Sequence, residues 1–139
     1  MRRVLDHNIL ICKQSEALDH ELLKDNNCKV LMCVAEDGDV PKYSDIITIK
    51  WGMSDPLTGL ADHNCIHEIV NLFDIAYRTA LRLNGNICIY CISGHNRSAI
   101  IPAIWLIDHQ YISLSDAAEL TQVKDCKNWM KVLGYNFKE

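Results

Sequence analysis

The sequence predicts an α/β fold in which a mostly parallel central sheet is flanked by helices. Short apolar runs of strand length alternate along the chain with segments in which apolar residues recur at helical spacing. The chain has 139 residues, the size of one domain, and 49% of them are apolar, which is enough to fill one core. No repeat, low-complexity tract or flexible linker interrupts it, so we expect a single domain over residues 1–139.

Four segments have the composition of strands. Residues 8–13 and 28–35 are apolar runs, and the second has the length of a strand that is buried on both faces. Residues 45–51 follow the turn-forming stretch EDGDVP, and residues 87–91 (ICIYC) follow NGN. Because helical segments separate most of these runs, we expect the strands to pair in parallel.

Helical segments fill the intervals. A short helix is expected over residues 16–24, and a longer one runs from about residue 66 until NGN stops it. A strongly apolar helix begins near Arg97, and Pro102 within it removes one backbone hydrogen bond, which predicts a kink.

Two further helices are expected near the end of the chain. Ser113 and Asp116 form an S-x-x-D capping pattern, which predicts a helix over residues 113–123. The tail, residues 126–137, is expected to form a last helix.

The charge balance limits the classes of partner. Fourteen basic and eighteen acidic residues give a net charge of −4 without a basic block, so a track for nucleic acid is not expected, whereas one local anion site is possible. The first residues lack the sustained apolar segment of a secretion signal, and the longest apolar stretch, 99–107, is too short to span a bilayer. We therefore expect a cytoplasmic protein without a membrane partner.

The cysteines indicate a reducing environment. There are seven, at positions 12, 28, 33, 65, 88, 91 and 126. An odd number, mostly inside apolar runs, favours buried free thiols over a disulfide framework. Cys88 and Cys91 form one C-x-x-C pair without a second, and His63 and His67 are better explained by a solvated helix start, so no metal site is expected.

One cysteine stands in a different setting. In YCISGHNRSA, residues 90–99, Cys91 closes a predicted buried strand and Arg97 opens an apolar helix. The backbone N–H groups between them can converge on an anion, and the helix N-terminus adds to a field that favours a thiolate. Gly94 permits close approach of the backbone, and Arg97 offers a planar fork for two phosphate oxygens. Ser98 is placed to donate a hydrogen bond to the sulfur.

This C-x5-R-S loop with its central glycine resembles the signature of the cysteine-dependent protein tyrosine phosphatase superfamily, H-C-x-x-G-x-x-R-[ST]. The segments NILICKQSEAL, CKVLMCVAED, IITIKW, NGNICIYC, RSAI and SLSDAAEL follow the order of the small, atypical dual-specificity phosphatases over nearly the full chain. The resemblance implies a protein tyrosine phosphatase-like fold and one catalytic domain over residues 1–139. It also implies a phosphorylated protein substrate, with hydrolysis of phosphotyrosine and phosphoserine or phosphothreonine and no cofactor.

Mapped onto this chain, the resemblance implies a two-step phosphoryl transfer. Cys91 attacks phosphorus and forms a cysteinyl-phosphate, and Ser98 helps the sulfur to leave. A carboxylic acid on a separate loop protonates the leaving oxygen and then activates water. Backbone N–H groups and the guanidinium hold the equatorial oxygens. The phosphate-binding residues are Ile92, Ser93, Gly94, His95, Asn96 and Arg97.

Two carboxylates in the loop of residues 52–64 are candidates for the acid. Asp62 stands next to the expected helix start, where an N-cap role explains it without chemistry. Asp55 lies in mid-loop after Trp51, at a position similar to that of the family's general acid, although a turn-forming Asp-Pro pair is an equally simple explanation. We favour Asp55, and Asp62 stays open.

Tyr90 is the clearest departure from the family pattern, which has histidine before the cysteine. A tyrosine can hydrogen-bond but carries no positive charge. We therefore expect Cys91 to ionise less readily than it would beside a histidine, without becoming inert. His95, inside the loop, could add charge, but an exposed turn residue is the simpler interpretation.

Two other functions stay open. Asn96 makes GHNRS similar to RNA 5′-triphosphatases of the same superfamily, so an RNA 5′ end is the second substrate class, although the acidic balance offers RNA no track. A phospho-binding pseudophosphatase would keep the loop and Arg97 without turnover, and Tyr90 is the feature that favours it. A low-molecular-weight phosphatase is disfavoured, because in that class the loop lies near the N-terminus and the acid follows it. The sequence does not indicate an oligomeric state.

Overall fold

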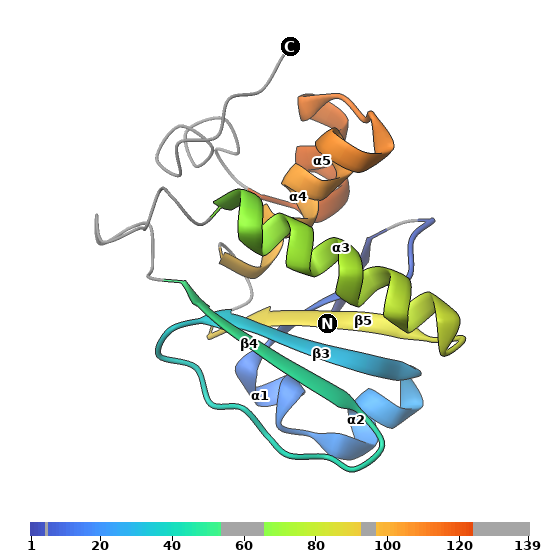
Figure 1. Ribbon diagram of the computed structural model, residues 1–139, viewed down its shortest axis with the longest axis vertical. Coiled ribbons are helices and arrows are strands. Elements are labelled where there is room, and N and C mark those ends of the chain that lie inside the picture. Colours follow the sequence, from blue (N-terminus) through green and yellow to red (C-terminus); the bar gives the residue numbers. More distant parts are fainter. Residues whose placement is uncertain (5, 54–65, 93–96, 124–139) are drawn as a thin grey trace.

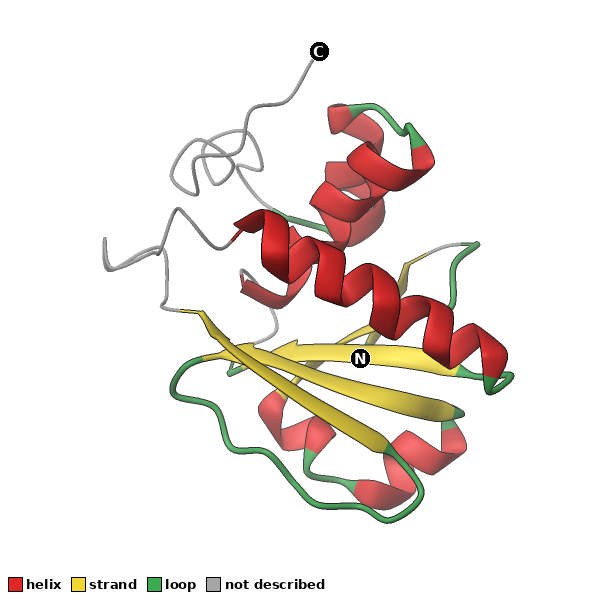
Figure 2. Ribbon diagram, viewed as in Figure 1, coloured by secondary structure: helices red, strands yellow, loops and turns green. Residues whose placement is uncertain are grey.

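A five-stranded sheet with helices on both faces forms the centre of the molecule in the computed structural model, which describes residues 1–4, 6–53, 66–92 and 97–123 (Figures 1 and 2). The strand order is β1-β2-β5-β3-β4. β1 is antiparallel to β2, and the other three pairs are parallel, which confirms the predicted mostly parallel α/β class. The strands are β1 (Arg2–Val4), β2 (Ile9–Lys13), β3 (Cys28–Ala35), β4 (Ile47–Met53) and β5 (Asn86–Cys91).

β5 occupies the centre of the sheet and ends at Cys91. It pairs with β2 through Lys13 opposite Cys91, and with β3 through Cys33 opposite Tyr90. Every residue of β5 is buried. Cys91 therefore ends a strand that is held on both sides, at the carboxyl edge where ligands bind in parallel sheets.

Helices cover both faces of this sheet (Figure 1). α1 and α2 pack below it in that view, and α3 and α4 pack on the opposite face, with α5 against α4. Their bounds are α1 (Gln14–Ala17), α2 (His20–Asp25), α3 (Ile66–Arg82), α4 (Arg97–Gln110) and α5 (Leu114–Thr121).

The helix expected over residues 16–24 is in fact two short helices, because Asp19 starts a new one. The Asp19 carboxylate accepts a hydrogen bond from the Leu22 amide at 3.2 Å, which is an N-cap contact. β1 is an addition that the sequence analysis did not predict. β4 begins at Ile47, two residues later than expected, where it comes opposite Val30 of β3.

The predicted end of α3 and the predicted cap of α5 agree with the structure, whereas α5 ends at Thr121, two residues earlier than expected. After α3, Asn84 takes a left-handed φ of 59°, and the Gly85 amide donates to the Ala80 carbonyl at 2.9 Å. The Ser113 hydroxyl accepts from the Asp116 amide at 3.1 Å and caps α5, as its sequence pattern indicates. α4 continues through Pro102 as one helix, and the expected helix over 126–137 lies outside the described residues.

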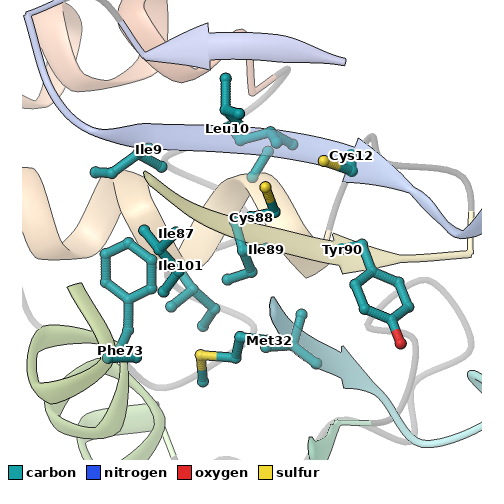
Figure 3. Packing of buried hydrophobic residues seen from close by; sticks show 14 of the residues in the cluster. Ile9, Leu10, Cys12, Met32, Phe73, Ile87, Cys88, Ile89, Tyr90 and Ile101 are labelled. Carbon is teal, nitrogen blue, oxygen red and sulfur yellow. The ribbon is translucent and has the colours of Figure 1, made fainter. Parts of the chain in front are cut away.

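The core lies mainly between the sheet and the layer formed by α3 and α4. Ile87 of β5 lies beside Phe73 of α3 and Ile101 of α4 (Figure 3). Residues 97–106 of α4 are all buried, which explains why this helix is apolar all round. Within the described residues, no helix has the length and apolarity needed to cross a membrane.

Candidate active site at the carboxyl edge of the sheet

Cys91 and Ser98 meet where β5 ends and α4 begins. The Cys91 sulfur lies 3.3 Å from the Ser98 hydroxyl oxygen, and both residues are buried. The strand holds the thiol, and the first turn of α4 holds the hydroxyl. If the sulfur is a thiolate, the hydroxyl is its donor, because a thiolate can only accept. The strand–turn–helix predicted from the sequence thus places these two side chains in contact.

Arg97 is the first residue of α4, and only 7% of its side chain is exposed. Its Nη1 donates a hydrogen bond to Asp37 Oδ1 at 2.8 Å. The hydrogen bond from Arg97 lowers the pKa of the Asp37 carboxyl below its usual range, so Asp37 is a carboxylate at neutral pH. A buried guanidinium is therefore held by an ionised carboxylate at the same edge as Cys91.

Asp37 is a site residue that the sequence analysis missed. It lies in the stretch EDGDVP, whose composition predicts only a turn between two strands. One signal was present: Asp37 comes two residues after β3, and parallel strands bring the residues that follow them to one edge. The partner, Arg97, lies 60 positions further along the chain, and no local pattern links the two.

Tyr90 lies on the face of β5 opposite to Cys91, because successive side chains of a strand alternate. Its ring is fully buried at the end of the strand (Figure 3), and its hydroxyl donates to the Asp39 carbonyl at 2.6 Å. Burial raises the pKa of Tyr90, so the phenol stays protonated and remains a donor. The residue that departs from the family motif is thus a hydrogen-bonding member of the edge.

α1 is tied to the same edge by Gln14. The Gln14 backbone N–H donates to the Ile92 carbonyl at 3.1 Å, and the Gln14 side-chain oxygen accepts from the Asp39 backbone N–H at 2.9 Å. Ile92 is the one predicted phosphate-binding residue, besides Arg97, within the described chain. The others, Ser93, Gly94, His95 and Asn96, lie outside the described residues, and so do both candidate acids, Asp55 and Asp62.

The remaining described cysteines belong to the core. Like Cys91, they are free and buried, which confirms the prediction of buried thiols for Cys12, Cys28, Cys33 and Cys88. Hydrogen bonding to Cys12 and Cys28, together with burial, strongly raises the pKa of Cys88, so Cys88 stays a thiol. Among the described residues no group of histidine, cysteine and carboxylate side chains could hold a metal ion.

A surface pocket lies elsewhere, between β1 and α5. Arg3, Asp116 and Glu119 line it, together with apolar and amide side chains. Within the described chain it brings together no nucleophile and no buried charge, so we do not include it in the candidate site at Cys91.

Comparison with known proteins finds likeness at the level of the fold. No family model and no curated protein matches the sequence. Among solved structures, human DUSP28 matches with a TM-score of 0.74 and 17% identity over 95% of this chain and 88% of that chain. A mouse putative dual specificity phosphatase complexed with zinc tungstate matches with a TM-score of 0.76 and 19% identity over 95% of this chain and 82% of that one.

A third neighbour is human tyrosine phosphatase-like serine/threonine/tyrosine-interacting protein. It matches with a TM-score of 0.74 and 13% identity over 96% of this chain and 93% of that chain. At these identities the likeness establishes the fold. The chain has the fold of the small dual-specificity phosphatases, as the resemblance of its loop implied.

Proposed function

We propose that this protein is a cysteine-dependent phosphomonoester hydrolase that acts on phosphotyrosine and on phosphoserine or phosphothreonine in proteins. The observation that carries the proposal is the buried Cys91–Ser98 contact beside the buried cation of Arg97, at the carboxyl edge of a fold shared with dual-specificity phosphatases. The tungstate in the mouse neighbour adds support, because tungstate is a tetrahedral oxyanion like phosphate. The described cysteines are free thiols, which fits a reducing compartment, and we place the protein in the cytoplasm.

In the proposed first step, the Cys91 thiolate attacks phosphorus and the bond to the leaving oxygen breaks. Asp55 donates a proton to that oxygen, so the product alcohol leaves neutral. Arg97 and the backbone N–H groups of residues 92–97 hold the equatorial oxygens of the transferring group. In the second step, Asp55 as a carboxylate takes a proton from water, which attacks phosphorus. The P–S bond breaks, and Ser98 donates a hydrogen bond to the departing thiolate.

The nucleophile is tested by substituting two cysteines of the same strand. Cys91→Ser is expected to lower the turnover of p-nitrophenyl phosphate by at least about 1,000-fold, because a serine hydroxyl is ionised far less readily than a thiol. Cys88→Ser makes the same change on the opposite face of β5 and should retain most activity. Turnover that survives in Cys91→Ser would overturn the proposed mechanism.

The acid is tested by a second matched pair. Asp55→Asn is expected to lower kcat by about 100-fold or more, because the leaving oxygen then departs without a proton. Asp62→Asn should change kcat little, because its expected role is an N-cap, which asparagine also fills. The effect should be smaller on p-nitrophenyl phosphate than on a phosphoserine peptide, because p-nitrophenolate leaves readily unprotonated. The reverse ranking of the two variants would assign the acid to Asp62.

The substrate class requires a panel of phosphotyrosine peptide, phosphothreonine peptide and 5′-triphosphate RNA, each with wild type and Cys91→Ser. Hydrolysis of both peptides by wild type supports the proposed function. Hydrolysis of RNA alone would support the second candidate, which rests on Asn96 in the loop. Tight phosphopeptide binding without turnover would support a pseudophosphatase, a role consistent with the neighbour named as an interacting protein.

A further inference from the structure

We propose that Asp37 and Tyr90 act as one positioning unit for Arg97, an inference that rests on the proposed phosphatase function. Asp37 holds the guanidinium, and Tyr90 holds the loop that carries Asp37. Neither residue needs to touch the substrate. Their shared effect is to fix the orientation of the arginine fork before phosphate arrives.

Arg97 is a buried cation. A guanidinium with 7% of its side chain exposed has lost most of its hydration, which is costly unless a charge partner and hydrogen bonds compensate. The Asp37 carboxylate supplies such a partner through a charge-assisted bond of 2.8 Å to Nη1. Because the guanidinium is planar and rigid, fixing one nitrogen restricts the direction of the whole fork.

Asp37, unlike Arg97, lies at the surface, and 66% of its side chain is exposed. An exposed carboxylate can orient a buried arginine only if its backbone is held, since otherwise the ordering entropy offsets most of the attraction. The stretch of residues 36–39 is held in this way. The Lys50 ammonium donates to the Gly38 carbonyl at 2.9 Å, and the Gly38 amide donates to the Ala35 carbonyl at 3.1 Å.

Tyr90 anchors the far end of that stretch. Its hydroxyl donates to the Asp39 carbonyl at 2.6 Å from a ring that is fully buried. The Gln14 side chain accepts from the amide of the same residue, Asp39, at 2.9 Å. Both backbone groups of Asp39 are therefore fixed two residues after Asp37. A histidine at position 90 would be shorter and would not offer this phenolic donor.

The test begins with Asp37→Asn, an isosteric change that removes the charge. Inorganic phosphate should bind about fivefold more weakly by isothermal titration calorimetry, and kcat/KM for p-nitrophenyl phosphate should fall by a similar factor. Asp37→Glu, which keeps the charge, should recover part of both. Asp45→Asn is the matched control, because it removes a carboxylate that pairs with His20 at 2.8 Å near the start of β4. It should change neither quantity.

Tyr90→Phe removes the hydroxyl and should weaken phosphate binding about threefold. Tyr43→Phe is its control, since Tyr43 also donates its hydroxyl to a backbone carbonyl, that of Ala17, at 3.1 Å. Because Tyr90 acts through Asp37, the double variant Tyr90→Phe with Asp37→Asn should bind phosphate about as weakly as Asp37→Asn alone. Effects that multiply would show independent roles and overturn the single unit.

Thermal unfolding separates positioning from general destabilisation. A loss of phosphate affinity that follows the melting temperature equally in the Asp37, Asp45, Tyr90 and Tyr43 variants would overturn the proposal. Asp37→Asn that binds phosphate like wild type would also overturn it while leaving the proposed function intact. Wild type that neither binds phosphate nor turns over a phosphomonoester would overturn the proposed function, and the role of Asp37 with it.

Discussion

Tyr90 and Cys91 are neighbours in the chain, yet the alternation of β5 sends their side chains to opposite faces. Cys91 meets Ser98 of α4, whereas Tyr90 meets the loop after β3 through the Asp39 carbonyl. A tyrosine before Cys91 therefore contributes to the edge from the far side of the sheet. Tyr90 can therefore affect Cys91 only indirectly, through the loop of residues 36–39 or through the backbone of β5.

Substitution of Gly38 tests how closely the loop of residues 36–39 must approach the sheet. A Cβ at this position would lie 2.7 Å from the Cys33 sulfur and 3.2 Å from the Ala35 Cβ. Gly38→Ala is therefore expected to push the loop outwards, with a loss of about 1–3 kcal/mol in the free energy of unfolding. Phosphate affinity should fall as well, because Asp37 moves with the loop. Urea denaturation and calorimetric titration measure the two effects.

The matched rescue removes the sulfur that causes the clash. Cys33→Ala alone should cost about 1 kcal/mol for the cavity it leaves, but it should restore both stability and phosphate binding when combined with Gly38→Ala. The double variant should thus be more stable than Gly38→Ala alone. A double variant as unstable as the sum of the two single variants would show that the contact with Cys33 is not the constraint.

Between elements, one buried carboxylate links α3 to α4. Asp74 of α3 accepts a hydrogen bond from the Trp105 indole N–H of α4 at 2.9 Å, and it also pairs with Arg78. Burial by itself would raise the pKa of Asp74, but these two hydrogen bonds and the nearby charges of Arg78 and His109 outweigh it and lower the pKa below its usual value. The ionised form is therefore the one that the folded state favours.

Because the pKa of Asp74 is lowered in the folded state, the free energy of unfolding depends on pH. A carboxyl whose pKa is depressed by folding contributes stability above its unfolded value of about 3.9, and loses that contribution as pH falls through the lower, folded value. Asp74→Asn should cost about 1–3 kcal/mol in the free energy of unfolding at pH 7. The gap between wild type and variant should narrow below about pH 4 in urea denaturation curves. A gap that stays constant from pH 7 to pH 3 would contradict the assignment.

The elements that the sequence predicted well are those whose signals are local. The helical repeat of α3 and the capping pair Ser113 and Asp116 each depend on residues a few positions apart. β1 was missed, because a strand of three residues with two arginines has no periodic signal. The sequence pattern predicts one helix where the structure has α1 and α2, because the Asp19 cap lies inside that segment. A helix boundary that depends on a single capping residue is therefore not visible in the helical pattern alone.

The candidate site shows the same difference: contacts between residues close in the sequence could be predicted, and contacts between distant residues could not. Cys91, Arg97 and Ser98 lie within eight residues, so their spacing predicts a strand–turn–helix, and the structure brings Cys91 and Ser98 into contact. The Asp37–Arg97 pair and the Tyr90–Asp39 bond join positions 60 and 51 residues apart. Such contacts follow from the order of strands in the sheet, which places β3 beside β5. The local sequence pattern does not indicate the order of the strands in the sheet.

At the scale of the whole molecule, the edge joins elements from most of the chain. β5 supplies Cys91, and α4 supplies Arg97 and Ser98. Gln14 of α1 donates its backbone N–H to the carbonyl of Ile92, next to Cys91, and Asp37 in the loop after β3 pairs with Arg97. An anion would bind at this edge only in the folded protein, because the unfolded chain does not bring these residues together. Binding should therefore stabilise the whole molecule by mass action.

Inorganic phosphate is accordingly expected to raise the melting temperature. At a concentration one hundred times its Kd, it should add about 2.7 kcal/mol to the free energy of unfolding. For a domain of this size that corresponds to a rise of roughly 5–10 °C in differential scanning calorimetry. Arg97→Met keeps the apolar stem without the charge and should lose most of this rise, whereas Arg82→Met, at the end of α3, should keep it. Phosphate also stabilises proteins by exclusion from their surface, so equal rises in all three proteins would contradict a specific anion site.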